Sequence, residues 1–203
     1  HQRIRASGTP LPLREARRKI RFGAFNEPSD HAARHNLTGL LIARNDEIWH
    51  EEYRFQRTPA MRFFGWSITK SVVGLLAGIA LDQGKIQSLD DRIDAYVPAL
   101  KNHPFADLTL RNLLNMTSGI DICEAFCTPN NGFDRYGFSQ IGYSPNRGQG
   151  TDQIQAMLDF KWGRNEAQGQ RFNYTDVNPT LIGWVLQTIY QQPLALIAQE
   201  QVW

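Results

Sequence analysis

Apolar and polar positions along the chain follow two periods, one typical of strands and one typical of helices. Residues 37–43 form a short apolar run, and residues 47–55 alternate apolar with polar side chains. The polar residues 44–46 separate these two segments, and so the region is predicted to be a β-hairpin. Residues 56–64 include a Thr-Pro pair and are predicted to form a loop.

Helical spacing dominates most of the remaining chain. The apolar segment 71–81 is predicted to be a buried helix that ends at Gly84, a residue suited to the left-handed conformation. Thr109 is the predicted N-cap of a short helix within 108–114. Further helices are predicted at 11–22, at 89–97 before Pro98, at 151–160, at 180–190 and from Pro193 onward.

The composition is that of an ordinary globular protein, with 41% hydrophobic and 21% charged residues among 203. A net charge of +2 is too small to indicate a nucleic-acid partner. No apolar run reaches the roughly 20 residues that a transmembrane helix needs. Basic residues cluster only near the start, where we interpret them as a solvated face: Arg14, Arg17, Arg18, Lys19 and Arg21.

Cysteine and histidine give little indication of a metal site. Cys123 and Cys127 either close a small disulfide or are two unrelated thiols, and the spacing leaves both readings open. His31 and His35 lie at helical i, i+4 spacing, but no third ligand accompanies them. No metal or cofactor is therefore expected.

Ser67 and Lys70 form a Ser-x-x-Lys motif at the start of the apolar helix. A helix N-terminus presents free N–H groups and the positive end of the dipole, which stabilise a developing oxyanion. Residues i and i+3 share one helix face, so the Lys70 amine can reach the Ser67 hydroxyl. Apolar neighbours are expected to bury the amine and lower its pKa, as a general base requires. The motif alone is weak, because about one match is expected by chance, and an ordinary helix start with a surface lysine is the alternative.

Further segments favour the catalytic interpretation, because the chain resembles the serine β-lactamase-like hydrolases. That family includes class C β-lactamases, DD-peptidases, EstB-like esterases and 6-aminohexanoate-dimer hydrolase, and the resemblance is strongest to the last of these. Five matches in the right order are highly specific together. They lie at residues 39–42, at 67–71, at 81–86 with 89–91, at 108–119, and at 172–176 with 181–184.

The resemblance implies roles for two residues of the 172–176 match. Tyr174 takes the place of the family's Tyr-x-Asn tyrosine, beside Lys70 and Ser67, and would pass a proton to the leaving group. A cationic lysine favours the phenolate, so the two side chains can share one proton. The third position is Asp176, where many relatives carry Asn, and an ionised Asp only accepts hydrogen bonds. Asp176 is therefore expected either to hold Lys70 positive or to bind a cationic substrate group.

Residues 121–150 are rich in Gly, Asn, Pro and aromatic residues, as functional loops often are. Tyr136 and Tyr143 are candidate substrate-binding residues if this loop lines a cleft. The alternative, which the pattern favours equally, is a loop pinned to the core by its aromatic side chains.

The family's third motif, a Lys/His-Thr/Ser-Gly triplet on an edge strand, does not follow Tyr174. We therefore expect a C-terminally truncated chain, or one that another chain completes. The predicted fold is α+β and β-lactamase/transpeptidase-like, an incomplete antiparallel sheet with flanking helices plus a mostly helical lobe. Residues 1–203 would form one domain, with 1–86 and 171–203 on the sheet side and 87–170 as the lobe.

Together these features predict a serine hydrolase that acts on a small ester, amide or peptide through an acyl-enzyme on Ser67, with Lys70 as base. The alternatives are DD-peptidase or β-lactamase activity, and a non-catalytic binding protein that keeps the fold. A periplasmic or secreted location is expected, with a cytoplasmic one as the alternative. The sequence leaves the oligomeric state open.

Overall fold

A computed structural model describes residues 5, 8–9, 12–21, 23, 26–121, 158 and 163–203. Backbone contacts divide the chain into two units, one of Ala6–Gly65 and one of His1–Arg5 with Trp66–Trp203. The predicted arrangement of one domain with a helical lobe at 87–170 stays a prediction, since much of that lobe lies outside the described residues.

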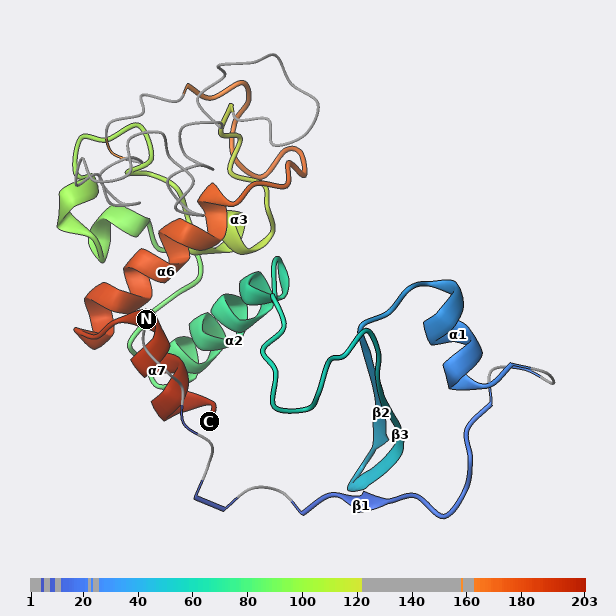
Figure 1. The fold of residues 1–203 in the computed structure, drawn as a ribbon. Coiled ribbons are helices and arrows are strands. Elements are labelled where there is room, and N and C mark those ends of the chain that lie inside the picture. The colour runs from blue at the N-terminus through green and yellow to red at the C-terminus, as the bar shows by residue number, and fades with distance from the viewer. Residues whose placement is uncertain are drawn as a thin grey trace, which may run out of the picture. The chain divides into compact units, whose positions relative to one another are not determined.

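The smaller unit holds a three-stranded sheet with the strand order β1-β3-β2. Strands β2 and β3 pair antiparallel, with Gly39 opposite Tyr53 and Arg44 opposite Glu47 (Figure 1). The hairpin prediction is therefore confirmed. The elements of this unit are β1 (Arg14–Glu15), α1 (Pro28–Arg34), β2 (Gly39–Arg44) and β3 (Glu47–Tyr53).

The predicted helix at 11–22 is wrong where the structure describes it. The backbone there is extended and pairs parallel with β3, so the sheet is mixed rather than purely antiparallel. The Arg14 amide donates to the Asp46 carbonyl at 2.9 Å, and the Ala16 amide donates to the Ile48 carbonyl at 2.8 Å. These hydrogen bonds to a neighbouring strand outweigh a weak helical pattern in which Leu13 stays 46% exposed.

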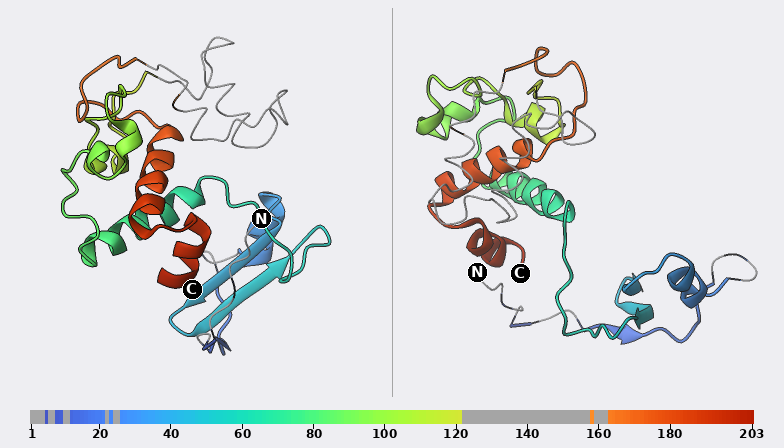
Figure 2. Two further views of the ribbon diagram at one scale, coloured as in Figure 1. Left: turned by 90° about the vertical axis from the view of Figure 1, so that its left-hand side faces the viewer. Right: turned by 45° about the horizontal axis from the view of Figure 1, so that its top comes forward.

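The larger unit is built around helices α2 and α6, which pack against each other, with α7 and α3 beside them (Figure 2). Buried residues of α2 recur at Val73, Leu76, Ala77 and Ala80, the spacing of one helix face. Gly84 follows this helix at a φ of +68°, as predicted. The helices are α2 (Ile68–Asp82), α3 (Leu110–Leu114), α6 (Val177–Tyr190) and α7 (Leu194–Gln201), with short 3-10 turns η1 (Ile93–Ala95) and η2 (Pro98–Leu100).

The helix predicted at 89–97 is wrong: that segment contains the 3-10 turn η1, and Pro98 opens η2 directly after it. The Ile93 amide donates across the chain to the Leu108 carbonyl at 2.8 Å, which diverts it from an α-helical bond. The short helix predicted within 108–114 is confirmed as α3. Thr109 is its N-cap, as predicted, and its side chain accepts from the Asn112 amide. The helices predicted at 180–190 and after Pro193 are confirmed as α6 and α7.

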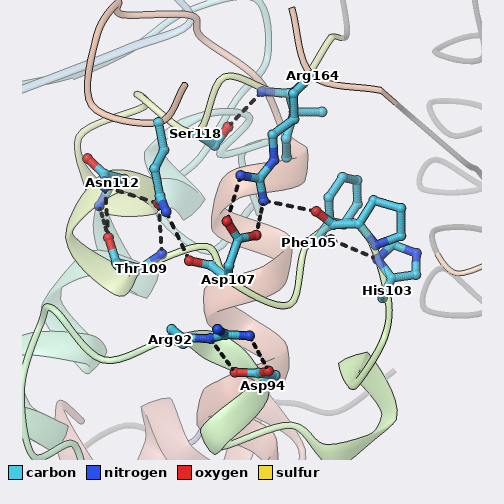
Figure 3. A network of polar contacts seen from close by, with 12 residues as sticks. Arg92, Asp94, His103, Phe105, Asp107, Thr109, Asn112, Ser118 and Arg164 are labelled. Carbon is cyan, nitrogen blue, oxygen red and sulfur yellow. Dashed lines mark hydrogen bonds and ion pairs between the residues drawn. The ribbon is translucent and has the colours of Figure 1, made fainter. Parts of the chain in front are cut away.

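A polar network ties the segment after residue 162 to the segment before α3 (Figure 3). Arg164 forms an ion pair with Asp107 and also donates to the Pro104 carbonyl at 2.9 Å. Gln168 donates to the Asp107 carbonyl at 2.9 Å and accepts from the Asn112 side chain at 3.1 Å. This network fixes the chain that leads into the residues before α6. In the part of the chain that the structure describes, no helix is long and apolar enough to cross a bilayer.

Candidate active site

Ser67 lies at the N-terminal end of α2, as the sequence predicted. It is the N-cap of the helix, and its side chain is exposed. Trp66, just before it, has a φ of +43°, a conformation that a bulky residue seldom adopts. Strained backbone of this kind often marks functional sites. This strain could not be predicted from the sequence, because no local pattern specifies the backbone angle of the residue before a helix.

Lys70 and Tyr174 both reach the Ser67 hydroxyl. The Lys70 ammonium donates to Ser67 Oγ at 2.9 Å from one turn further along the helix. The Tyr174 hydroxyl donates to the same oxygen at 2.7 Å from just before α6. Lys70 Nζ also lies 4.7 Å from the centroid of the Tyr174 ring. The structure therefore brings together the three side chains predicted to be catalytic.

The loop that carries Tyr174 is held by its neighbours. The Asn173 amide donates to the Met116 carbonyl at 2.7 Å, and its side chain donates to the Ile120 carbonyl at 3.3 Å. Thr175 is fully buried. Sequence reasoning did not identify Met116 and Asn173 as supports of the site. Their position inside two of the matched segments, 108–119 and 172–176, was the available signal.

Asp176 forms an ion pair with Lys70, whose side chain is only 17% exposed. Burial by itself lowers the pKa of Lys70, but the hydrogen bonds with Asp176 and Tyr174 outweigh it and raise that pKa above its ordinary value. The expectation that burial would lower the pKa of Lys70 is therefore wrong. Its physical reason is the carboxylate, which favours the charged amine more than desolvation disfavours it. Lys70 is an ammonium in this site.

The remaining predicted residues are not part of this cluster. Tyr136 and Tyr143 lie outside the described residues, as do Cys123 and Cys127 and most of the predicted helix 151–160. Among the described residues, no group of three or more His, Cys, Asp or Glu side chains could hold a metal ion.

Ser67 and Lys70, at the start of α2, and Tyr174, just before α6, form a cluster that can support chemistry with a serine nucleophile. The chain belongs to the beta-lactamase family, because the family model described as Beta-lactamase matches residues 29–203. The predicted family and the β-lactamase/transpeptidase-like fold are confirmed.

The chain is similar in sequence to one characterised hydrolase and similar in fold to several solved structures. It is 23% identical over 150 residues to the 6-aminohexanoate-dimer hydrolase of Paenarthrobacter ureafaciens, covering 74% of this chain and 37% of that one. A solved structure from Bacillus anthracis, described as a candidate 6-aminohexanoate-dimer hydrolase, matches with a TM-score of 0.68 at 19% identity. That match covers 96% of this chain and 52% of the other. A class C beta-lactamase structure matches with a TM-score of 0.53 at 18% identity, covering 82% and 43%. The chain therefore spans about half the length of these relatives or less.

Proposed function

We propose that this protein hydrolyses an ester or amide bond through an acyl-enzyme on Ser67. The observation that carries the proposal is the meeting of Lys70 Nζ and the Tyr174 hydroxyl at one serine oxygen, at 2.9 and 2.7 Å. A serine hydroxyl is a weak nucleophile until a neighbouring group accepts its proton, and both partners lie within the distance that proton transfer needs. The family is one of serine hydrolases, which agrees with this chemistry.

The charge on Lys70 determines which partner takes the proton. Lys70 Nζ lies 2.9 Å from Ser67 Oγ and 4.7 Å from the centroid of the Tyr174 ring, so its charge acts on both hydroxyl groups. Asp176 favours the ammonium form of Lys70, which has no lone pair with which to accept the serine proton. The Tyr174 oxygen, which donates to Ser67 Oγ in the structure, acts as the acceptor once it has lost that proton, and Lys70 supplies positive charge beside it and beside Ser67. This division of roles refines the prediction that Lys70 alone is the base.

The reaction then proceeds in two halves. The Ser67 proton moves to the Tyr174 oxygen while Ser67 Oγ bonds to the substrate carbonyl carbon. The N-terminal end of α2 stabilises the negative charge that develops on the carbonyl oxygen. The bond to the leaving group breaks, and Tyr174 returns its proton to that group. Water then bonds to the acyl carbon while its proton moves to the Tyr174 oxygen. The bond between that carbon and Ser67 Oγ breaks, Tyr174 returns the proton to Ser67 Oγ, and the acid is released.

The test is covalent labelling of the protein in its complete natural form. A fluorophosphonate should add to the chain once, and intact mass should show the adduct. Ser67→Ala should abolish the adduct. Ser71→Ala should not, since it removes another exposed serine of the same helix, one turn away. An adduct that survives in Ser67→Ala, or none in the natural protein, would refute the proposal.

The alternative within the family is β-lactam-directed or DD-peptidase activity. Turnover of a chromogenic cephalosporin can be compared with that of a p-nitrophenyl ester of a short acid. Faster turnover of the ester supports the proposal. Faster turnover of the cephalosporin supports the alternative.

A further inference from the structure

The charge of the candidate site is set by an acidic residue that takes no part in the proton transfers. Asp176 is the N-cap residue of α6, and its side chain makes no capping hydrogen bond. Its carboxylate instead forms an ion pair with the Lys70 ammonium. An amide of the same shape at this position would leave the site one unit more positive in every protonation state of the other groups.

We propose that Asp176 is a specificity-determining residue, which cancels the Lys70 charge and so selects neutral or cationic acyl donors over donors that carry a carboxylate near the scissile bond. This inference rests on the proposed hydrolase function and names the substrate class for that site. Two observations support it: the ion pair between Lys70 and Asp176, and the short distance between Lys70 Nζ and Ser67 Oγ.

The distance matters because the substrate must come close to the same lysine. A reacting carbonyl carbon lies about 3 to 3.5 Å from the nucleophilic oxygen. Lys70 Nζ lies 2.9 Å from Ser67 Oγ, so substituents next to the carbonyl lie within several ångströms of the ammonium. An uncompensated ammonium at that range would attract a carboxylate. The Asp176 carboxylate removes that attraction.

Other charges along the same loop do not restore a positive site. Arg171, three residues before Tyr174, forms an ion pair with Glu166 at 2.9 Å. Lys70 and Asp176 beside Ser67 are thus a balanced pair, and the Tyr174 oxygen adds a negative charge only while it is deprotonated, before it accepts the Ser67 proton. A cationic donor is favoured and an anionic one is repelled.

The magnitude follows from Coulomb's law. Removing one unit charge about 6 Å from a substrate carboxylate, in the intermediate dielectric of a partly exposed site, changes the relative rate by roughly ten- to a hundredfold. The side chain of Asp176 is 33% exposed, and so we expect the lower end of that range at physiological salt.

The experiment uses three p-nitrophenyl esters of the same short acyl chain, with a neutral, a carboxylate or an ammonium group close to the scissile carbonyl. The measured quantity is kcat/KM for each ester. In the natural protein, the carboxylate ester should be the poorest of the three. Asp176→Asn should raise kcat/KM for the carboxylate ester relative to the neutral one by about tenfold.

Two further variants separate charge from shape. Asp176→Glu keeps the negative charge and should keep the order of the three esters. Asp90→Asn removes a carboxylate that pairs with Arg111 away from Ser67, and should change no ratio. Loss of selectivity in Asp176→Asn, with selectivity retained in Asp176→Glu, cannot come from a generally weakened fold.

The outcomes separate this inference from the hydrolase proposal. Labelling of Ser67 together with an unchanged carboxylate ratio in Asp176→Asn would overturn the inference and leave the hydrolase proposal standing. A natural protein that prefers the carboxylate ester would also overturn it, without need of any variant. Failure of Ser67 to label would overturn both.

Discussion

Gly119 follows the matched Thr-Ser pair and has a φ of +71°. A Cβ added there would lie 2.4 Å from the Glu166 carbonyl oxygen, a backbone atom that cannot rotate away. Two costs therefore add in Gly119→Ala: about 1–2 kcal/mol for a left-handed alanine, and about 1–3 kcal/mol for the steric overlap. We expect a loss of about 2–5 kcal/mol in the free energy of unfolding.

Gly84→Ala is the matched control. Gly84 has nearly the same φ, +68°, but a Cβ there would meet nothing within 4 Å. Only the conformational cost of about 1–2 kcal/mol applies, and the gain from a less flexible unfolded chain is common to both variants. Urea unfolding followed by circular dichroism would measure the difference. Equal losses in the two variants would refute the argument from the Glu166 contact.

Three smaller perturbations test other parts of the larger unit. Thr109→Ala removes the acceptor for the Asn112 amide and should cost about 1 kcal/mol in denaturant unfolding, whereas Thr109→Ser should cost little. The hydrogen bond with Arg164 lowers the pKa of Asp107, so Asp107→Asn should destabilise the protein at neutral pH. The difference in the free energy of unfolding between the two proteins should vanish as the pH falls below about 4. Because the Asp107 side chain is half exposed, that difference should be under about 1 kcal/mol. A constant difference between pH 3 and 7 would contradict this. Leu76→Ala, at a fully buried position of α2, should cost about 2–5 kcal/mol in the same unfolding assay. A cost under about 1 kcal/mol would show that the side chains around Leu76 are not tightly packed.

The parts of the fold that were predictable are those in which local pattern and tertiary packing agree. Helix α2 has both an apolar face and a left-handed glycine after its end, and the β2–β3 hairpin has alternation and turn residues. The helix prediction for 11–22 was wrong because the conformation of that segment is set by hydrogen bonds to β3, which its own residues do not specify. The helix prediction for 89–97 was wrong for the same reason, because the Ile93 amide donates to the Leu108 carbonyl.

The residues of the candidate site could be predicted from the sequence, but the charge on Lys70 could not. Ser67, Lys70 and Tyr174 occur in recognisable segments, and the structure places them in contact. The charge on Lys70 could not be predicted, because it depends on the balance of burial and a carboxylate 106 positions further along the chain. That the third position of the 172–176 match is acidic was visible in the sequence. Its contact with Lys70 required the fold.

The two hydroxyl groups of the site, on Ser67 and Tyr174, lie 107 positions apart in the chain. Closing a loop of that length costs entropy, and the docking of α6 on α2 helps to offset that cost. We expect Tyr174 to reach Ser67 in a refolding chain only when α6 docks on α2. If acylation of Ser67 is followed during refolding, the time at which it begins should report when the two helices dock. The proposed reaction would then measure how fast the larger unit assembles.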